Sequence, residues 1–430
     1  MRRQIVAGRI GDIQLTPLQR FITASGMTNL ADGVAVVAWA WIASLLTRDA
    51  FLVALVPVAL RLPWFLLALP AGVITDRVDR RWLILRMDAL RGLAFAVAAL
   101  ALWAALPLAP APVAGVSDPL LYGALILAAF VVGGAEVFRD NAAQTMLPAF
   151  VPPDRLERAN GQLWSAELLT NALIGPALGA MLIAVWLPLA FGLNAVAYGL
   201  ALLLVAGVAG QFRPARADAR DWRAELVEGL GFLRGKPLLR TLAWTTGFWN
   251  LFHQMIVIGV VLHAQENLGL SATAYGLTLA GGALGGIAGS LLGDRISRAL
   301  GPARTMQWML LASGPCFAAM AMAPGPVTLG LCFAAMEFSG FVWNVVSVST
   351  RQRMIPDGLR GRVNSLYRLL AWGMMPVGLL LSGLLVTLAE TLLPREVALT
   401  LPFWAAGLGA VLLSLVVWRA IWRGFAPQQH

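Results

Sequence analysis

Long apolar runs alternate with short polar gaps along nearly the whole chain. A helix needs about 20 mostly apolar residues to cross the hydrocarbon core of a bilayer, and most of the runs have this length. The two longest runs each exceed one crossing, and prolines at 188 and at 324 and 326 divide them, because proline cannot continue a helical hydrogen-bond ladder. The pattern predicts twelve membrane-spanning helices, at 19–46, 50–73, 82–106, 120–143, 161–185, 188–209, 239–263, 273–293, 304–323, 327–349, 364–388 and 398–420.

Composition supports a membrane protein and excludes a water-soluble one. Hydrophobic residues make up 59% of the 430 residues and charged residues 13%, whereas soluble domains carry about 25% charged residues. The two cysteines, Cys316 and Cys332, lie inside apolar runs and are interpreted as packing residues. The fold class predicted is therefore all-α, a polytopic integral membrane protein.

The net charge of +10 does not indicate a nucleic-acid partner, because its distribution follows the membrane. Of the 32 basic residues, 28 lie in alternate gaps and at the two ends of the chain; Arg48 and Arg395 fall on the other side, and Arg61 and Arg91 lie within spans. Basic residues concentrate on the cytoplasmic side of membrane proteins. We therefore predict a multi-pass protein of the cell inner membrane with both termini cytoplasmic, in contact with lipid and without a cleavable signal peptide.

The chain contains an internal repeat. Four short patterns recur in the same order at spacings that fall from 221 to 204 residues. The pairs are Gly26–Leu30 with Gly247–Leu251, Asp76–Arg80 with Asp294–Arg298, Gln144–Pro148 with Gln352–Pro356, and Arg158–Asn160 with Arg362–Asn364. Parallel repeats of this kind imply two six-helix halves around a central cavity and transport by alternating access.

The predicted domains are an N-terminal six-helix bundle at 1–210, a cytoplasmic linker at 211–237 and a C-terminal six-helix bundle at 238–430. The part of the linker from Asp221 to Lys236 is either a helix on the inner membrane surface or simply a charged connection.

Three motifs resemble those of one transporter family. The segment Gly72-Val-Ile-Thr-Asp76-Arg77-Val-Asp-Arg80-Arg81 resembles the loop signature of the major facilitator superfamily. Gly175-Pro176-Ala-Leu-Gly179 resembles the Gly-Pro-x-x-Gly signature of its exporting branches. The segments 61–63, 148–152 and 158–161 are similar to the transmembrane-secretion-effector branch, which includes enterobactin exporters and macrolide efflux pumps.

This resemblance implies a monomeric transporter with the major facilitator fold and a gating role for Asp76. The sequence departs from the pattern in the fourth span, where drug:proton antiporters often carry an arginine and this chain has Phe130.

Ionisable side chains inside spans are costly, so each is a candidate for function. Asp32 in the first span and Glu136 in the fourth are the predicted proton-coupling residues. For Asp32 the alternative is a permanent ion pair with Arg61 or Arg91 that only holds the spans together. Asp140 is interpreted as an interfacial partner of Arg139, and Glu167 and Glu337 are lower-ranked candidates.

The repeat aligns Asp32 with His253 and Glu136 with Asn344. Two acids of the first half therefore correspond in sequence to a histidine and an amide of the second half. We therefore hypothesise that the first half couples to protons and the second binds polar groups of a substrate. For His253 the alternative is a histidine that only packs its span. The predicted substrate-binding residues are Asn29, Trp39, Arg61, Trp249, Asn250, His253 and Asn344.

The predicted gating residues lie at the cytoplasmic ends of spans or at helix contacts. The alternatives are plain membrane anchoring for the charged residues and generic helix packing for the small ones. The residues are Gly72, Asp76, Arg77, Arg80, Asp88, Arg91, Gly175, Pro176, Gly179, Asp294, Arg295 and Arg298.

Together these features predict a secondary active exporter of a small amphipathic molecule, such as a drug or a siderophore, that works by proton antiport. The expected partners are a small-molecule substrate, protons and membrane lipid, with no nucleic acid. No cofactor or metal is expected, and no enzyme motif is present. A proton-independent facilitator or importer, or a lysolipid flippase of the same fold, remains as the alternative.

Overall fold

The computed structural model describes residues 15–75, 77–152, 156–210, 212–213, 222–356 and 359–425, and these ranges are almost entirely helical. The first half of the chain forms α1 (Pro17–Leu46), α2 (Ala50–Thr75), α3 (Arg80–Ala104), α4 (Pro119–Met146), η1 (Leu147–Ala149), α5 (Leu156–Glu167), η3 (Leu168–Ile174), α6 (Gly175–Val185) and α7 (Leu187–Ala206). The second half forms α8 (Trp222–Gly235), α9 (Pro237–Leu262), η4 (His263–Asn267), α10 (Ala272–Leu300), α11 (Pro302–Ala321), α12 (Pro326–Met354), α13 (Arg360–Gly373), α14 (Met375–Ala389), α15 (Arg395–Ala398) and α16 (Leu401–Phe425).

Each of the twelve predicted spans is helical in the structure, with ends that lie within seven residues of those predicted. The fifth is built from α5, η3 and α6, and the eleventh from α13 and α14. Ten of the crossings are long and apolar enough to span a membrane on those criteria alone. The other two, α3 and α11, are packed beside them, α3 against α4 and α7 and α11 against α12 and α16.

Helix starts follow from local sequence. Proline occupies the first turn of α1, α4, α7, α9, α11 and α12, where its missing N–H leaves no helical hydrogen bond unmade. Thr16 and Gln19 form a capping box at the start of α1. Asp79, Asp118 and Ser271 each accept a hydrogen bond from a backbone N–H in the first turn of the helix that they precede.

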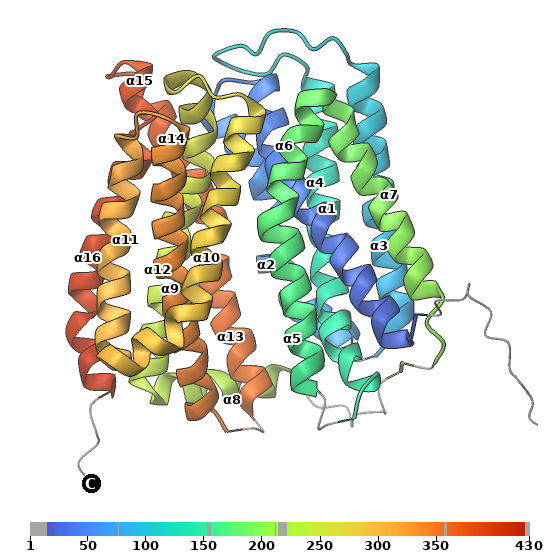
Figure 1. Cartoon of the computed structure of the whole chain (residues 1–430), viewed down its shortest axis with the longest axis vertical. Coiled ribbons are helices and arrows are strands. Elements are labelled where there is room, and N and C mark those ends of the chain that lie inside the picture. The colour runs from blue at the N-terminus through green and yellow to red at the C-terminus, as the bar shows by residue number, and fades with distance from the viewer. Residues whose placement is uncertain are drawn as a thin grey trace, which may run out of the picture.

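Figure 1 shows α1–α7 gathered on one side and α9–α16 on the other, with α8 lying across one end. We refer to this end as the α8 end and to the opposite one as the α15 end. The helical part of the predicted linker is confirmed as α8, whereas residues 211 and 214–221 lie outside the described ranges. The residue boundaries of the predicted domains stay predictions.

The two halves touch closely where α2 meets α14 and where α6 meets α10. A Cβ atom on Gly383 would lie 2.7 Å from the backbone oxygen of Ala50, and one on Gly276 would lie 2.8 Å from that of Pro176. Only glycine permits such an approach of two helix backbones.

Candidate functional site

The first feature of the site is an ion pair between α1 and α3 inside the first half. Arg91 Nη2 donates to Asp32 Oδ1, and the hydroxyl of Tyr198 on α7 donates to the same oxygen at 2.6 Å. The guanidinium of Arg91 also lies over the Tyr198 ring, 4.5 Å from its centroid. Arg91 is completely buried, while 18% of the Asp32 side chain is exposed. The ion pair left open as an alternative for Asp32 is therefore present, and its partner is Arg91.

Glu136 on α4 extends this pair. Its carboxylate lies 3.9 Å from Arg91 Nη2 and 4.0 Å from Arg61 Nη1 on α2. Asp32, Arg91, Glu136 and Arg61 thus form a series of alternating charges that connects α1, α3, α4 and α2. We call these four residues the charge chain. Two acids and two arginines balance, as buried charges must if they are to avoid a large desolvation cost.

A second buried cluster surrounds Arg139 on α4. Its Nε lies 3.6 Å from Asp88 on α3, its Nη1 lies 3.5 Å from Asp140, and its Nη2 donates to Ser25 Oγ on α1 at 3.2 Å. The predicted pair of Arg139 and Asp140 is confirmed. Asp88 is completely buried, and its ion pair is with Arg139. A gating role for Asp88 and Arg91 stays a prediction.

The second half has a different pair at the aligned position. His253 Nε2 and Glu337 Oε1 are 2.8 Å apart and join α9 to α12, with 19% and 22% of their side chains exposed. The Trp249 ring stacks on His253 with a centroid separation of 5.0 Å and an interplanar angle of 26°. Trp249 Nε1 donates to Ser313 Oγ on α11 at 3.1 Å. His253, Glu337 and Trp249 thus form one polar and aromatic group. We call His253 and Glu337 the histidine–glutamate pair.

The other predicted substrate-binding residues are dispersed. Asn29 donates to the backbone of Ser25, one turn away, and Asn250 donates to the backbone of Ala371 on α13. Asn344 is exposed on α12. Trp39 is only 1% exposed and is packed on Phe95 and Phe191 in the core of the first half, which contradicts the predicted substrate contact in this conformation.

The predicted gating charges lie at the α8 end. Asp76 is outside the described residues. Gly72 is half-buried in α2, Arg77 is exposed, and Arg80 donates to the backbone of Thr145 on α4 at 2.9 Å. In the second half Asp294 and Arg298 pair with each other at 2.7 Å on an exposed surface, beside exposed Arg295. A gating role for these charges stays a prediction.

The Gly-Pro motif brings α6 against α1. A Cβ on Gly175 would lie 2.5 Å from Gly33 Cα, and one on Gly179 would lie 2.6 Å from the Val34 backbone oxygen. The segment before Pro176 is a π-helix, η3, because proline has no N–H with which to continue the α-helical ladder. The motif therefore sets both a close contact and a local change of helix geometry.

At the α15 end, polar side chains connect the two halves. Arg48 Nη1 donates to Gln265 Oε1 at 2.6 Å and lies 3.6 Å from Glu266 Oε1. Arg395 donates to Glu266 at 2.5 Å, to the Arg48 backbone at 2.6 Å and to Glu390. We call these contacts, with the hydrogen bonds from Gln265 to Ser44 and from Thr387 to Asp49, the α15-end network. Burial raises the pKa of Glu390, although Arg395 acts against this rise.

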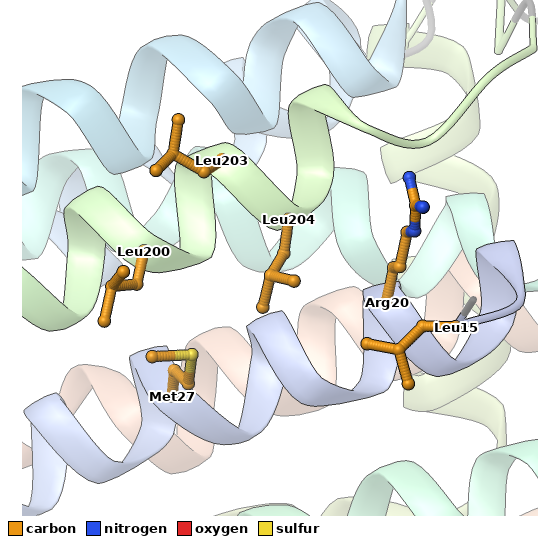
Figure 2. Close-up of a pocket in the computed structure, with 6 residues that line it drawn as sticks. All are labelled: Leu15, Arg20, Met27, Leu200, Leu203 and Leu204. Atoms are coloured by element: carbon orange, nitrogen blue, oxygen red, sulfur yellow. The ribbon is translucent and has the colours of Figure 1, made fainter. Parts of the chain in front are cut away.

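A groove of about 380 Å³ lies elsewhere, between α1 and α7 (Figure 2). None of the predicted site residues lines it, and Arg20 is its one charged lining residue, with Nη1 donating to the Gly207 backbone at 2.6 Å. The lining residues are Leu15, Arg20, Met27, Leu200, Leu203 and Leu204.

Sequence reasoning missed three parts of this picture. Tyr198 carried no signal, because a tyrosine in an apolar run is ordinary. Glu337 carried the same signal as the other acids within spans, but its partner was not foreseen. The α15-end network was foreshadowed only by Arg48 and Arg395, the two basic residues set apart from the other 28.

Two packed groups of membrane-crossing helices, with balanced charges buried between helices of the first group, define a multi-pass membrane transporter. The sequence matches the Major Facilitator Superfamily over residues 21–378, so the chain belongs to that family, and the family consists of transporters and not of enzymes.

Relatives and solved structures agree with this assignment. The multidrug efflux pump Tap of Mycolicibacterium fortuitum is 27% identical over 92% of this chain and 95% of its own. The enterobactin exporter EntS of Shigella boydii serotype 4 is 24% identical over 69% of this chain and 67% of its own. A bacterial homologue of the iron transporter ferroportin, crystallised in an inward-facing state, has a similar fold, with a TM-score of 0.71, 21% identity, and coverage of 95% of this chain and 99% of that chain.

Proposed function

We propose that this transporter exports small amphipathic molecules from the cell by proton antiport. The single observation that carries the proposal is the charge chain, in which each of four helices contributes one charge near the others. A proton that neutralises Asp32 or Glu136 leaves an arginine without its full counter-charge. The buried arginine then favours a different arrangement of α1–α4, so protonation and helix arrangement are linked.

The direction of transport rests on relatives and on the energy source. Tap and EntS are named as exporters, which supports efflux by this chain. No nucleotide-binding motif was found in the sequence, so the proton gradient is the proposed source of energy. A potential of ~100 mV contributes about 2.3 kcal/mol for each charge that moves across the membrane.

We place the chain termini and the α8 end in the cytoplasm, as the distribution of basic residues suggests. The α15-end network then joins the halves on the outer side, so the described conformation corresponds to a transporter closed to the outside. Opening to the outside requires these contacts to break and the halves to rock apart there. Protonation of the charge chain from the outside would return the protein to this state.

The test is uptake into proteoliposomes whose interior is made acidic. Nile red, a neutral amphipathic dye, should enter the vesicles as protons leave, and removal of the pH gradient should abolish the uptake. Asp32→Asn should lower the rate of gradient-driven uptake at least about tenfold, because the proton-binding group is gone. Asp32→Glu should retain part of it, and Glu396→Gln, a change on the exposed surface of α15, should retain all of it.

Two results would contradict the proposal. Equal uptake with and without the gradient, in the wild type and in Asp32→Asn, would indicate a facilitator. Movement of a fluorescent lysolipid between leaflets, with no uptake of the dye, would indicate a lysolipid flippase.

A further inference from the structure

Glu337 differs from four acids of the first half in the kind of partner it has. Asp32, Glu136, Asp88 and Asp140 each lie within 4.0 Å of an arginine nitrogen, whereas the one ion pair found for Glu337 among the described residues is with His253. Arginine keeps its charge at any ordinary pH, but histidine does not. When His253 is neutral, Glu337 carries a negative charge inside the membrane with no fixed counter-charge.

The surroundings of Glu337 suit an organic cation. The Trp249 ring stacks on His253 beside the carboxylate, and aromatic faces attract cations. Gly340 leaves space for the tryptophan, because a Cβ at this position would lie 2.6 Å from Trp249 Cη2. About a fifth of each of the His253 and Glu337 side chains is exposed, so the pair is not sealed inside the protein core.

We propose that Glu337, His253 and Trp249 form a binding site for the cationic group of an amphipathic substrate, and that the bound cation takes the place of the proton on His253. In the empty site the proton on the imidazole Nε2 balances the carboxylate. When the cation arrives, its charge balances Glu337 and the proton leaves His253 for the solvent. The pair therefore holds either the proton or the cation, and never both at once. This inference rests on the proposed export function and names the class of substrate.

The helices that pack against α9 and α12 also carry titratable groups. The helices packed against α9 and α12 include α14, which has no titratable residue. Among the described residues, no ion pair or hydrogen bond joins the histidine–glutamate pair to any other charged group of these helices; most of the others lie near helix ends. The titratable residues in the middle parts of the neighbouring helices are Asp32, Arg61, Tyr275, Cys316, Tyr367 and Arg368.

The experiment measures equilibrium binding of tetraphenylphosphonium to the purified full-length protein in a non-ionic detergent between pH 5.5 and 8.5. In the wild type the affinity should rise with pH, by no more than tenfold per pH unit, because one proton leaves for each cation bound. Tetraphenylborate, which has the same shape and the opposite charge, should show no such rise.

Three variants separate the roles. Glu337→Gln should weaken tetraphenylphosphonium binding by at least about tenfold at every pH, and Glu337→Asp should retain part of the affinity. His253→Gln should still bind the cation but should lose most of the pH dependence. Glu396→Gln, the matched change outside the site, should behave as the wild type, and the elution volume on size exclusion checks that each variant is folded.

The outcomes distinguish this proposal from the export function. Equal affinity in Glu337→Gln and the wild type would overturn the cation site, as would the absence of binding in the wild type at every pH. An unchanged pH dependence in His253→Gln would overturn the displacement of its proton. In each case gradient-driven uptake of neutral Nile red would still show whether the protein is a proton-coupled exporter.

Discussion

The two halves of this transporter share a sequence pattern, yet they balance their buried charges differently. In the first half four acids, Asp32, Glu136, Asp88 and Asp140, are paired with arginines, whose charges are permanent. In the second half Glu337 is paired with His253, whose charge depends on pH. A change of charge in the first half must therefore occur on an acid, whereas in the second half it can occur on the base.

A second difference between the halves lies in how the helix geometry changes near a proline. In the first half the crossing continues through the π-helix η3 up to Gly175 and Pro176. In the second half the corresponding crossing is interrupted at Met374, between α13 and α14, just before Pro376. Both follow from the missing N–H of proline, but the first solution keeps the helix continuous and the second does not.

The largest expected effect comes from removing the permanent charge in the first half. Arg91→Gln leaves Asp32 and Glu136 without their shared buried partner, which should cost about 3–5 kcal/mol of stability. Thermal unfolding in detergent, followed by size exclusion, measures this loss. The double variant Arg91→Gln with Asp32→Asn should recover much of it, and a double variant as unstable as the single one would contradict the pairing.

A smaller effect is expected where backbones touch. Gly179→Leu places a side chain against the Val34 backbone, and Gly378→Leu places one against the Leu251 backbone in the second half. Each substitution should lower the free energy of unfolding by about 1–3 kcal/mol, because the new side chain meets backbone and a whole helix has to move to make room for it. Gly192→Leu is the control, since nothing lies within 4 Å of its Cβ position. Equal unfolding temperatures for all three variants would contradict these close contacts.

The smallest effect is expected at the contact between the halves. Arg395→Gln removes one charge from the α15-end network together with the hydrogen bond from Arg395 to the Arg48 backbone, which crosses between the halves. The Arg395 side chain is 24% exposed, and charged contacts as exposed as this contribute only about 0.2–1 kcal/mol. The population open at the α15 end should therefore rise by a few-fold at most. Distances between spin labels on the two halves measure it, with Arg419→Gln on exposed α16 as the control. An unchanged distribution would show that the network does not hold the halves together.

Much of the fold was predictable because the bilayer imposes a simple rule on the sequence. Apolar length gave the twelve crossings, and prolines gave the division of the two longest apolar runs. The site was only partly predictable. Asp32 and Glu136 stood out as acids within spans, and Arg91 was one of two foreseen partners for Asp32. Trp39 was assigned to substrate, but it is a core residue, because a helical pattern alone does not reveal which neighbour a face meets.

What the sequence by itself determined is the membrane environment, the number of crossings and their repeat. Each of these follows from the order of apolar and polar residues along the chain and needs no knowledge of which helices touch. What only the tertiary structure decided is the partner of each buried charge. Tyr198 reaches Asp32 across 166 residues, and Glu337 reaches His253 across 84. Such contacts depend on how helices are placed and rotated against one another. Helix placement is set by the packing of all the crossings together, through close contacts such as that of Gly175 with Gly33, and no single segment encodes it.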